Sequence, residues 1–170
     1  AARAFVHRSH SGHFGIVNSE SCYQNLTRFL FGNIRVDGVL IIEDLSLPKK
    51  IQEKYDSGKQ IRASYNFETV VGVRGQRWNL HRRLVSEGSS ILRKFDELFR
   101  SDKPRHPRLF STYLSLSQRI NARRKSLGFS VDLSVMVPEY EVDRKWFPDD
   151  LYQGGYLFRD KINLEVTPSS

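Results

Sequence analysis

Alternation of apolar and polar residues is the dominant pattern in the second half of the chain. It is clearest in four segments, 61–73, 78–84, 110–116 and 129–137. Successive side chains of a strand point to opposite faces, so this period predicts strands with one apolar and one solvent-facing side. A last strand is expected at 156–166, with alternate residues on its apolar side: Tyr156, Phe158, Ile162, Leu164 and Val166.

A different period marks the segment after Ser19. Its apolar positions are Cys22, Tyr23, Leu26, Phe29 and Leu30, which recur at the spacing of one helix face. Asn18 or Ser19 can cap the start of this helix, and Gly32 can end it. The single cysteine cannot form an internal disulfide, and its place on the apolar face predicts a buried small side chain.

Four other segments carry mixed signals. Asp37-Gly38 between two apolar runs predicts a two-residue hairpin turn. Residues 48–59 are polar, and we expect a connection with one or two helical turns before Gly58. The spacing in 91–99 fits a helix or an irregular strand, and 139–155 reads as an acidic, aromatic loop.

These elements together predict a mainly β fold: an antiparallel β-sandwich with an N-terminal loop-helix segment. The chain of 170 residues, 39% of them hydrophobic and 12% aromatic, is large enough to bury a core. No apolar run approaches the roughly 20 residues that span a bilayer. The first residues lack an initiator Met and a signal-peptide pattern, so we expect them to continue a longer polypeptide.

Positive charge is concentrated in one part of the chain. The formal net charge is +8, and the window from Arg74 to Lys125 holds fourteen Lys or Arg against four Asp or Glu. The stretch Arg119 to Lys125 lies between two predicted strands, so we expect it at an exposed end of a sheet. Such a surface suits an anionic partner, or it is simply a solvated basic surface.

One short segment carries a chemical signal. His13-Phe14-Gly15-Ile16-Val17-Asn18-Ser19, followed by the predicted helix, resembles the catalytic-histidine loop and terminal helix of bacterial lipases and esterases of the α/β-hydrolase fold. The resemblance covers about the first 35 residues. It implies that His13, or else His10, is the general base that takes a proton from a catalytic serine.

The same resemblance implies a division of the chain. Residues 1–35 would be the tail of a hydrolase-like domain, and 36–170 would be an accessory β-sandwich. No Gly-x-Ser-x-Gly nucleophile motif and no assignable catalytic acid occur in these residues. The chain would therefore be catalytically incomplete alone and would meet its ester or lipid substrate through the parent enzyme.

Other interpretations of the candidate residues stay open. The histidine-rich loop can be a flexible segment without chemistry, or His7, His10 and His13 can hold a metal, although no Asp, Glu or Cys adjoins them. His81 and His106 lie among arginines, with no orienting acid nearby in the sequence. The late carboxylates can form a calcium site or a solvated loop: Glu139, Glu141, Asp143, Asp149 and Asp150.

The functional alternatives follow from these residues. Beside the hydrolase fragment, a non-enzymatic β-sandwich module can bind an anionic lipid surface, a polysaccharide or a protein, using the basic stretch and the aromatic pair Trp146-Phe147. Nucleic acid is not expected, because no helix-turn-helix, zinc-finger or RNA-binding signature is present. The residues call for no cofactor and no metal, and they leave the oligomeric state open.

Overall fold

A computed structural model of the chain describes residues 20–100, 106–143, 148 and 150–167. The described strands are β1 (Ile34–Val39), β2 (Ile61–Val73), β3 (Asn79–Arg83), β4 (Ile91–Lys94), β5 (Arg108–Leu114), β6 (Leu127–Val142) and β7 (Asp150–Val166). The described helices are α1 (Glu20–Phe31), α2 (Lys49–Asp56), α3 (Phe95–Phe99) and the 3₁₀ turns η1 (Val85–Glu87) and η2 (Leu116–Gln118). This content confirms the predicted mainly β class and the N-terminal helix.

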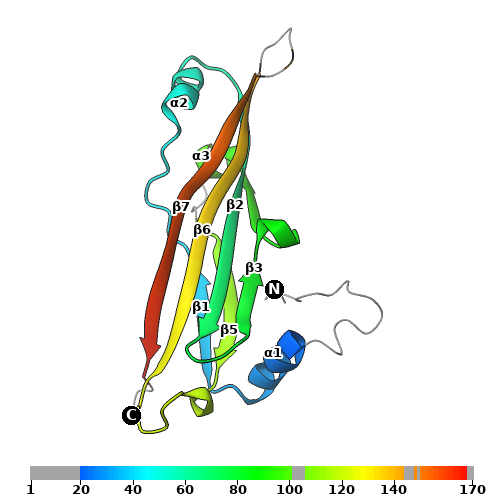
Figure 1. Cartoon of the computed structure of the whole chain (residues 1–170). Coiled ribbons are helices and arrows are strands. Elements are labelled where there is room, and N and C mark those ends of the chain that lie inside the picture. Colours follow the sequence, from blue (N-terminus) through cyan, green and yellow to red (C-terminus); the bar gives the residue numbers. More distant parts are fainter. Residues whose placement is uncertain (1–19, 101–105, 144–147, 149, 168–170) are drawn as a thin grey trace, which may run out of the picture.

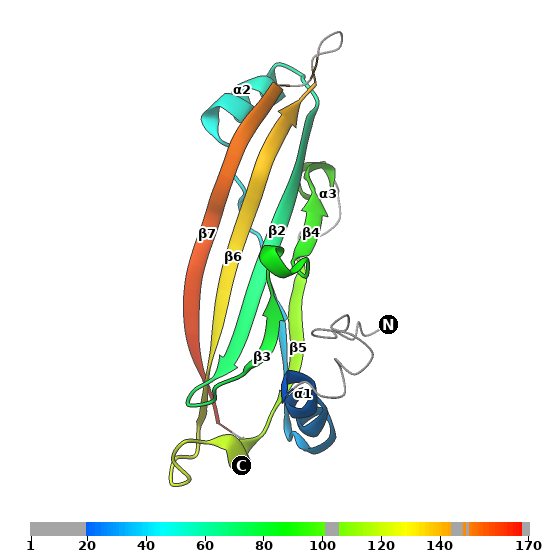
Figure 2. The same cartoon turned by 45° about the vertical axis from the view of Figure 1, so that its right-hand side comes forward.

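The strands form two antiparallel layers. The larger sheet has the order β3-β2-β6-β7, with β4 pairing the same side of β2 as a separate short strand, and the smaller sheet is the β1-β5 pair. Figures 1 and 2 show β2, β6 and β7 running along the length of an elongated molecule, and in Figure 1 β1 and β5 lie behind these strands. Helix α2 lies near one end of these strands and α1 near the other (Figure 2).

The core lies between the inner face of the larger sheet and a second layer that consists of the smaller sheet, the segment 40–47, α2 and α3. Buried side chains alternate along β6 from Leu127 to Leu133 and along β2 from Thr69 to Val73, whereas residues 65–69 of β2 are buried on both faces. β5 contributes Leu109, Phe110 and Leu114 from the other layer. The alternation that predicted these strands is therefore the alternation of core and surface.

The predicted hairpin at Asp37-Gly38 is wrong. Both residues lie inside β1, where they pair with Ser111 and Phe110 of β5. The ring of Phe110 covers Gly38, and a Cβ at that position would overlap the ring. Glycine is required here for close approach of a side chain and not for a turn, a distinction that the dipeptide alone does not carry.

The expected loop at 139–155 is also wrong over most of its length. β6 continues to Val142 and β7 begins at Asp150. Tyr140 and Val142 are both fully buried, so buried positions continue beyond Pro138, but their phase changes from odd to even residues where the β2-β6 register shifts. Glu139 and Glu141, on either side of Tyr140, are more exposed, and this acidic pair made the segment look like a loop.

A bulge changes the face of one aromatic residue. Phe158 pairs with Val135, whereas Tyr156 pairs with Met136, and the register shifts between these two pairs. Because paired residues share a face, Tyr156 lies on the outer face of the sheet and Phe158 on the inner face. The expected common side of Tyr156 and Phe158 is therefore wrong, whereas Phe158, Ile162, Leu164 and Val166 do share the inner face.

Most of the remaining local expectations agree with the structure, one is met by both of its alternatives, and one is wrong. α1 ends at Phe31 before Gly32, α2 precedes Gly58, and the bulge expected near Gly72 appears in the β2-β3 register. The ambiguous segment 91–99 contains both predicted alternatives, β4 followed by α3. The expected burial of Cys22 is wrong, because the side chain is only half-buried on a helix whose apolar side faces away from the sandwich.

The close approach at Gly38 gives a stability prediction. Gly38→Ala forces the Phe110 ring to move, and we expect a loss of about 1–3 kcal/mol in the free energy of unfolding, typical of overpacking. Gly155→Ala on β7 is the matched control, because a Cβ there meets open space, and its effect should stay within about 0.5 kcal/mol. Urea denaturation followed by fluorescence measures both, and equal effects would contradict the packing role of Gly38.

Candidate functional site

The histidines proposed as catalytic lie outside the described residues. This applies to His10 and His13, to His7 of the metal alternative, and to the aromatic pair Trp146-Phe147. Of the remaining histidines, His81 is buried on β3 and its ring lies 5.8 Å from that of Phe110. His81 is therefore a core residue, whereas His106 is exposed.

The late carboxylates are distributed along strands. Glu139 and Glu141 belong to β6 and Asp150 to β7, and Glu141 forms an ion pair with Arg62 of β2 at 3.3 Å. Within the described part of the chain, no group of three or more His, Cys, Asp or Glu side chains is placed to hold a metal. Asp149 lies outside that part.

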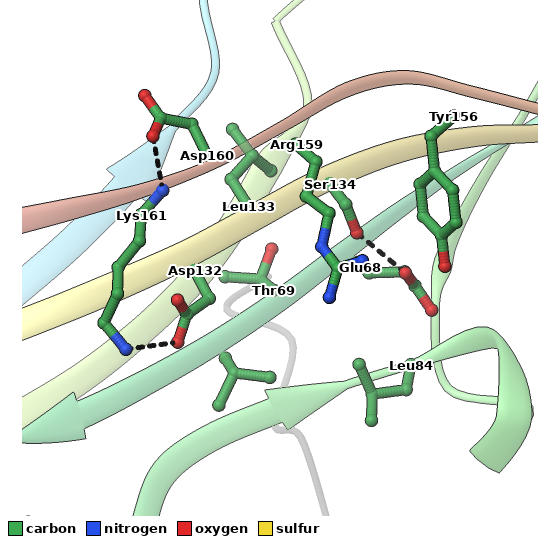
Figure 3. A pocket seen from close by; sticks show the side chains of 11 residues that line it. Glu68, Thr69, Leu84, Asp132, Leu133, Ser134, Tyr156, Arg159, Asp160 and Lys161 are labelled. Atoms are coloured by element: carbon green, nitrogen blue, oxygen red, sulfur yellow. Dashed lines mark hydrogen bonds and ion pairs between the residues drawn. The ribbon is translucent and has the colours of Figure 1, made fainter.

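The outer face of the larger sheet carries a polar groove of about 600 Å³. Figure 3 shows its side chains, which come from the middle of β2, β6 and β7 and from Leu84 next to η1. Its polar lining is Glu68, Thr69, Asp132, Ser134, Tyr156, Arg159, Asp160 and Lys161. The bulge in the β6-β7 pair places Tyr156 in this groove, which the simple period of the sequence did not predict.

Glu68 is the buried anchor of the groove. Its side chain is 9% exposed, and its carboxylate accepts a hydrogen bond from the Ser134 hydroxyl at 2.7 Å and another from the backbone N–H of Val85 at 2.8 Å. The second bond ties η1 to the sheet. Both carboxylate oxygens are thus used in structural bonds.

The other charges of the groove are also engaged, but closer to solvent. Lys161 contacts Asp132 on the neighbouring strand at 3.2 Å, and both side chains are about half exposed. The guanidinium of Arg159 lies 5.6 Å from the centre of the Tyr156 ring, a cation–π distance. Figure 3 shows these side chains projecting from β6 and β7.

This arrangement lacks the parts of a hydrolytic centre. Ser134 donates to a carboxylate without an intervening histidine, and the described lining contains no histidine. Nucleophilic serine chemistry requires a base that takes the proton and a group that orients the base. Within the described residues the groove therefore does not present the serine-histidine pair of an acyl-transfer site.

Helix α1 is the second notable feature, because a basic side chain faces the sandwich and the apolar side chains face away from it. Its basic residue Arg28 faces the sandwich, is 2% exposed, lies 6.0 Å from the centre of the Trp78 ring, and donates from Nε to Oε1 of Gln118 at 3.3 Å. Burial lowers the pKa of Arg28 to about 10. The helix therefore attaches to the sandwich through its polar side.

The apolar side of α1 faces away from the sandwich. Its exposed fractions are large: Tyr23 61%, Leu26 57%, Phe29 64%, Leu30 59% and Phe31 76%. One aromatic contact, between Phe29 and Tyr113 of β5, has ring centres 5.7 Å apart. An apolar stripe of this kind normally covers a core, so the helix has a packing face that the sandwich does not use.

A basic tip lies at the same end of the molecule as α1 (Figure 1). We define it as Arg74, Arg77, Ile120, Arg123, Arg124 and Lys125, all of which are exposed. The loop is ordered by hydrogen bonds, one from Arg119 to the Arg124 carbonyl at 2.6 Å and one from the Arg123 N–H to Oδ1 of Asn121 at 2.9 Å. Ile120, 67% exposed, lies against Gly75. The expectation that 119–125 is largely exposed is confirmed.

The two polar pairs of the groove should differ in stability. Glu68→Ala leaves the Ser134 hydroxyl and the Val85 N–H without an acceptor, so we expect a loss of about 1–3 kcal/mol. Asp132→Ala removes only an exposed ion pair and should cost less than about 1 kcal/mol. Thermal or urea unfolding of the two variants checks the order, and a larger effect at Asp132 would contradict the anchoring role of Glu68.

Comparison with known proteins does not identify a relative. No family model, no curated protein and no solved structure matches the chain. Among the described helices, none has the length and apolar character needed to cross a membrane. The functional assignment therefore rests on the residues themselves.

Proposed function

We propose that this chain is the C-terminal part of a serine esterase or lipase, in which the β-sandwich is an accessory to a catalytic domain. The observation that carries the proposal is the exposed apolar face of α1. A terminal helix of an α/β-hydrolase packs its apolar side against the central sheet of that domain, and α1 has such a side free of the sandwich.

The sequence before α1 supports the same assignment. His13 stands seven residues before Glu20, the first residue of α1, and the segment resembles the catalytic-histidine loop of lipases and esterases. In this proposal His13 takes the proton from the hydroxyl of a serine located elsewhere in the parent polypeptide. That serine then attacks the ester carbonyl, forms an acyl-enzyme and is regenerated by water.

The sandwich-facing side of α1 explains how the two parts are joined. Arg28 packs between Trp78 and Gln118, while Leu26 and Leu30 point away from them. The helix can thus contact two bodies at once, one through each side. Movement of the accessory domain would then act directly on the helix that follows the proposed catalytic loop.

The first test uses the polypeptide that carries the whole hydrolase. We expect it to hydrolyse p-nitrophenyl esters and to react with a fluorophosphonate, and His13→Ala should lower kcat roughly 10⁴-fold. His10→Ala in the same background is the matched control and should retain activity if His13 is the base. An inert parent, or full activity in both variants, would overturn the proposal.

The packing of α1 has a separate test. Leu26→Asp combined with Leu30→Asp should destabilise the parent and lower its fluorophosphonate labelling, because the charges would enter an apolar interface. In the 170-residue chain the same changes should alter stability by less than about 0.5 kcal/mol each, since both positions are exposed there. Ile41→Asp, at a residue 65% exposed outside α1, is the control in both backgrounds.

The basic tip favours one role for the accessory domain: contact with an anionic lipid surface. Ile120 projects among basic residues, and a membrane interface accepts an apolar side chain surrounded by cations. Each Lys or Arg near an anionic membrane contributes about 1 kcal/mol. This role agrees with an enzyme whose ester substrate resides in a lipid phase.

Vesicle binding tests this role. Co-sedimentation should show binding to vesicles with phosphatidylglycerol and little binding to pure phosphatidylcholine, and Arg123→Gln with Lys125→Gln should weaken it about 30-fold. Lys49→Gln with Lys50→Gln on α2 removes the same charge elsewhere and should have little effect. Equal loss in both double variants would indicate attraction by net charge alone.

A further inference from the structure

β7 leaves the larger sheet with a long open edge. It has 17 residues and pairs only with β6 among the described strands, whereas the opposite side of β2 is occupied by two strands of five and four residues. Figure 1 shows β7 at the margin of the sheet, away from β1 and β5. The outward backbone N–H and C=O groups of an edge strand form a template for another strand.

The inner face of β7 is mostly apolar and uncovered, with the charged Asp160, which pairs with Leu133, between Phe158 and Ile162. Ile162 is 44% exposed although its partner in the register, Val131, is 6% exposed, and Phe158 is 46% exposed opposite Val135 at 6%. The second layer therefore covers the inner face of the larger sheet as far as β6 and leaves the inner face of β7 exposed. Apolar side chains next to the core, interrupted at Asp160, therefore remain open along the edge, and exposed apolar surface of this kind marks interaction surfaces.

The part of β7 that carries these side chains is regular. From Phe158 to Val166 it pairs with β6 without a register shift and contains no proline. Two of the devices that prevent edge pairing, a bulge and glycines, are confined to the first part of the strand, whereas the charged residues Arg159, Asp160 and Lys161 lie within Phe158–Val166. The stretch Phe158–Val166 can therefore accept a full complement of strand hydrogen bonds.

We propose that the occupant of this edge is a second copy of the chain. Two β7 strands would pair antiparallel about a twofold axis at Ile162, so that the two larger sheets join into one. Residues equally distant from Ile162 then face each other. Arg159 faces Glu165 of the partner subunit, and Phe158 faces the partner subunit's Val166.

Charge complementarity selects this arrangement. Arg159 and Glu165 lie on the outer face, and among the described residues neither has an oppositely charged partner within the chain. The twofold axis brings them together twice. Opposite charges that face each other across paired strands stabilise the pairing, and like charges oppose it.

The neighbouring registers are less favourable. An axis at Arg159, Asp160 or Lys161 would place that charged residue directly opposite its own copy. An axis at Asn163 would leave Arg159 opposite Thr167 and would pair Glu165 with Lys161, which already contacts Asp132. A shift of the pairing by one residue would place the apolar side chains of one β7 strand on the same face as the polar side chains of the other.

The first experiment measures the mass of the 170-residue chain over a concentration series by size-exclusion chromatography with light scattering. We expect a dimer, and Arg159→Glu or Glu165→Arg alone should raise its Kd about tenfold or more, because each change creates two like-charge contacts. The combined swap should restore the dimer. Lys50→Glu and Glu53→Arg on the exposed side of α2 are the charge-matched controls.

The register has its own test. Ile162→Cys in a Cys22→Ser background should form a disulfide-linked dimer on mild oxidation, because facing residues in paired strands have a Cα separation that a disulfide can span. Ile41→Cys in the same background should not. A monomer at every concentration, or a dimer insensitive to both charge reversals and lacking the Ile162→Cys cross-link, overturns the proposal.

Another outcome would assign the dimer to a different surface. If Leu26→Asp with Leu30→Asp abolishes it while the charge reversals on β7 leave it intact, the α1 face is the interface and the β7 proposal fails. The β7 proposal does not rest on the hydrolase assignment, since mass and cross-linking report the edge whereas ester hydrolysis reports the catalytic residues.

Discussion

The antiparallel pairing of β2 with β6 is the interaction on which the rest of the structure depends. It joins Ile61–Val73 to Leu127–Val142, with a register shift between Ala63 and Asn66. β3 and β4 attach to the free side of β2, and β7 attaches to the free side of β6. The apolar alternation of both strands has to keep one common face, and that face becomes the floor of the core.

The second layer is narrower than the first, and this mismatch determines where apolar surface remains open. β1 and β5 cover β2 and β6, and they leave β7 uncovered along its inner face. α1 adds a second open apolar surface, because the sandwich uses its Arg28 side. The two surfaces suit different occupants: a helix face fits another packed domain, and a strand edge fits another strand.

The outer groove shows how a charged surface can be structural. Glu68 is bonded to Ser134 and Val85, and Asp132 to Lys161, so these charges stabilise the positions of strands and of η1. The described lining offers no histidine beside the Ser134 hydroxyl. Chemistry by the proposed hydrolase would therefore depend on the segment that includes His13 and on residues of the parent domain, and the sandwich would contribute positioning and surface contact.

The sequence alone determined the class of the fold and most of its strands, because the two-residue period of 61–73 and 129–137 follows directly from the two faces of a half-buried sheet. It also determined α1, since the spacing of Tyr23, Leu26 and Leu30 admits only one helix face. Only the tertiary structure decided which residues pack against these elements and which face of each element is buried. Gly38 supports the Phe110 ring instead of a turn, a bulge moves Tyr156 to the outer groove, and Arg28 lies inside while the apolar stripe lies outside. Each of these depends on a partner distant in the chain, and the local period of a sequence carries no information about that partner.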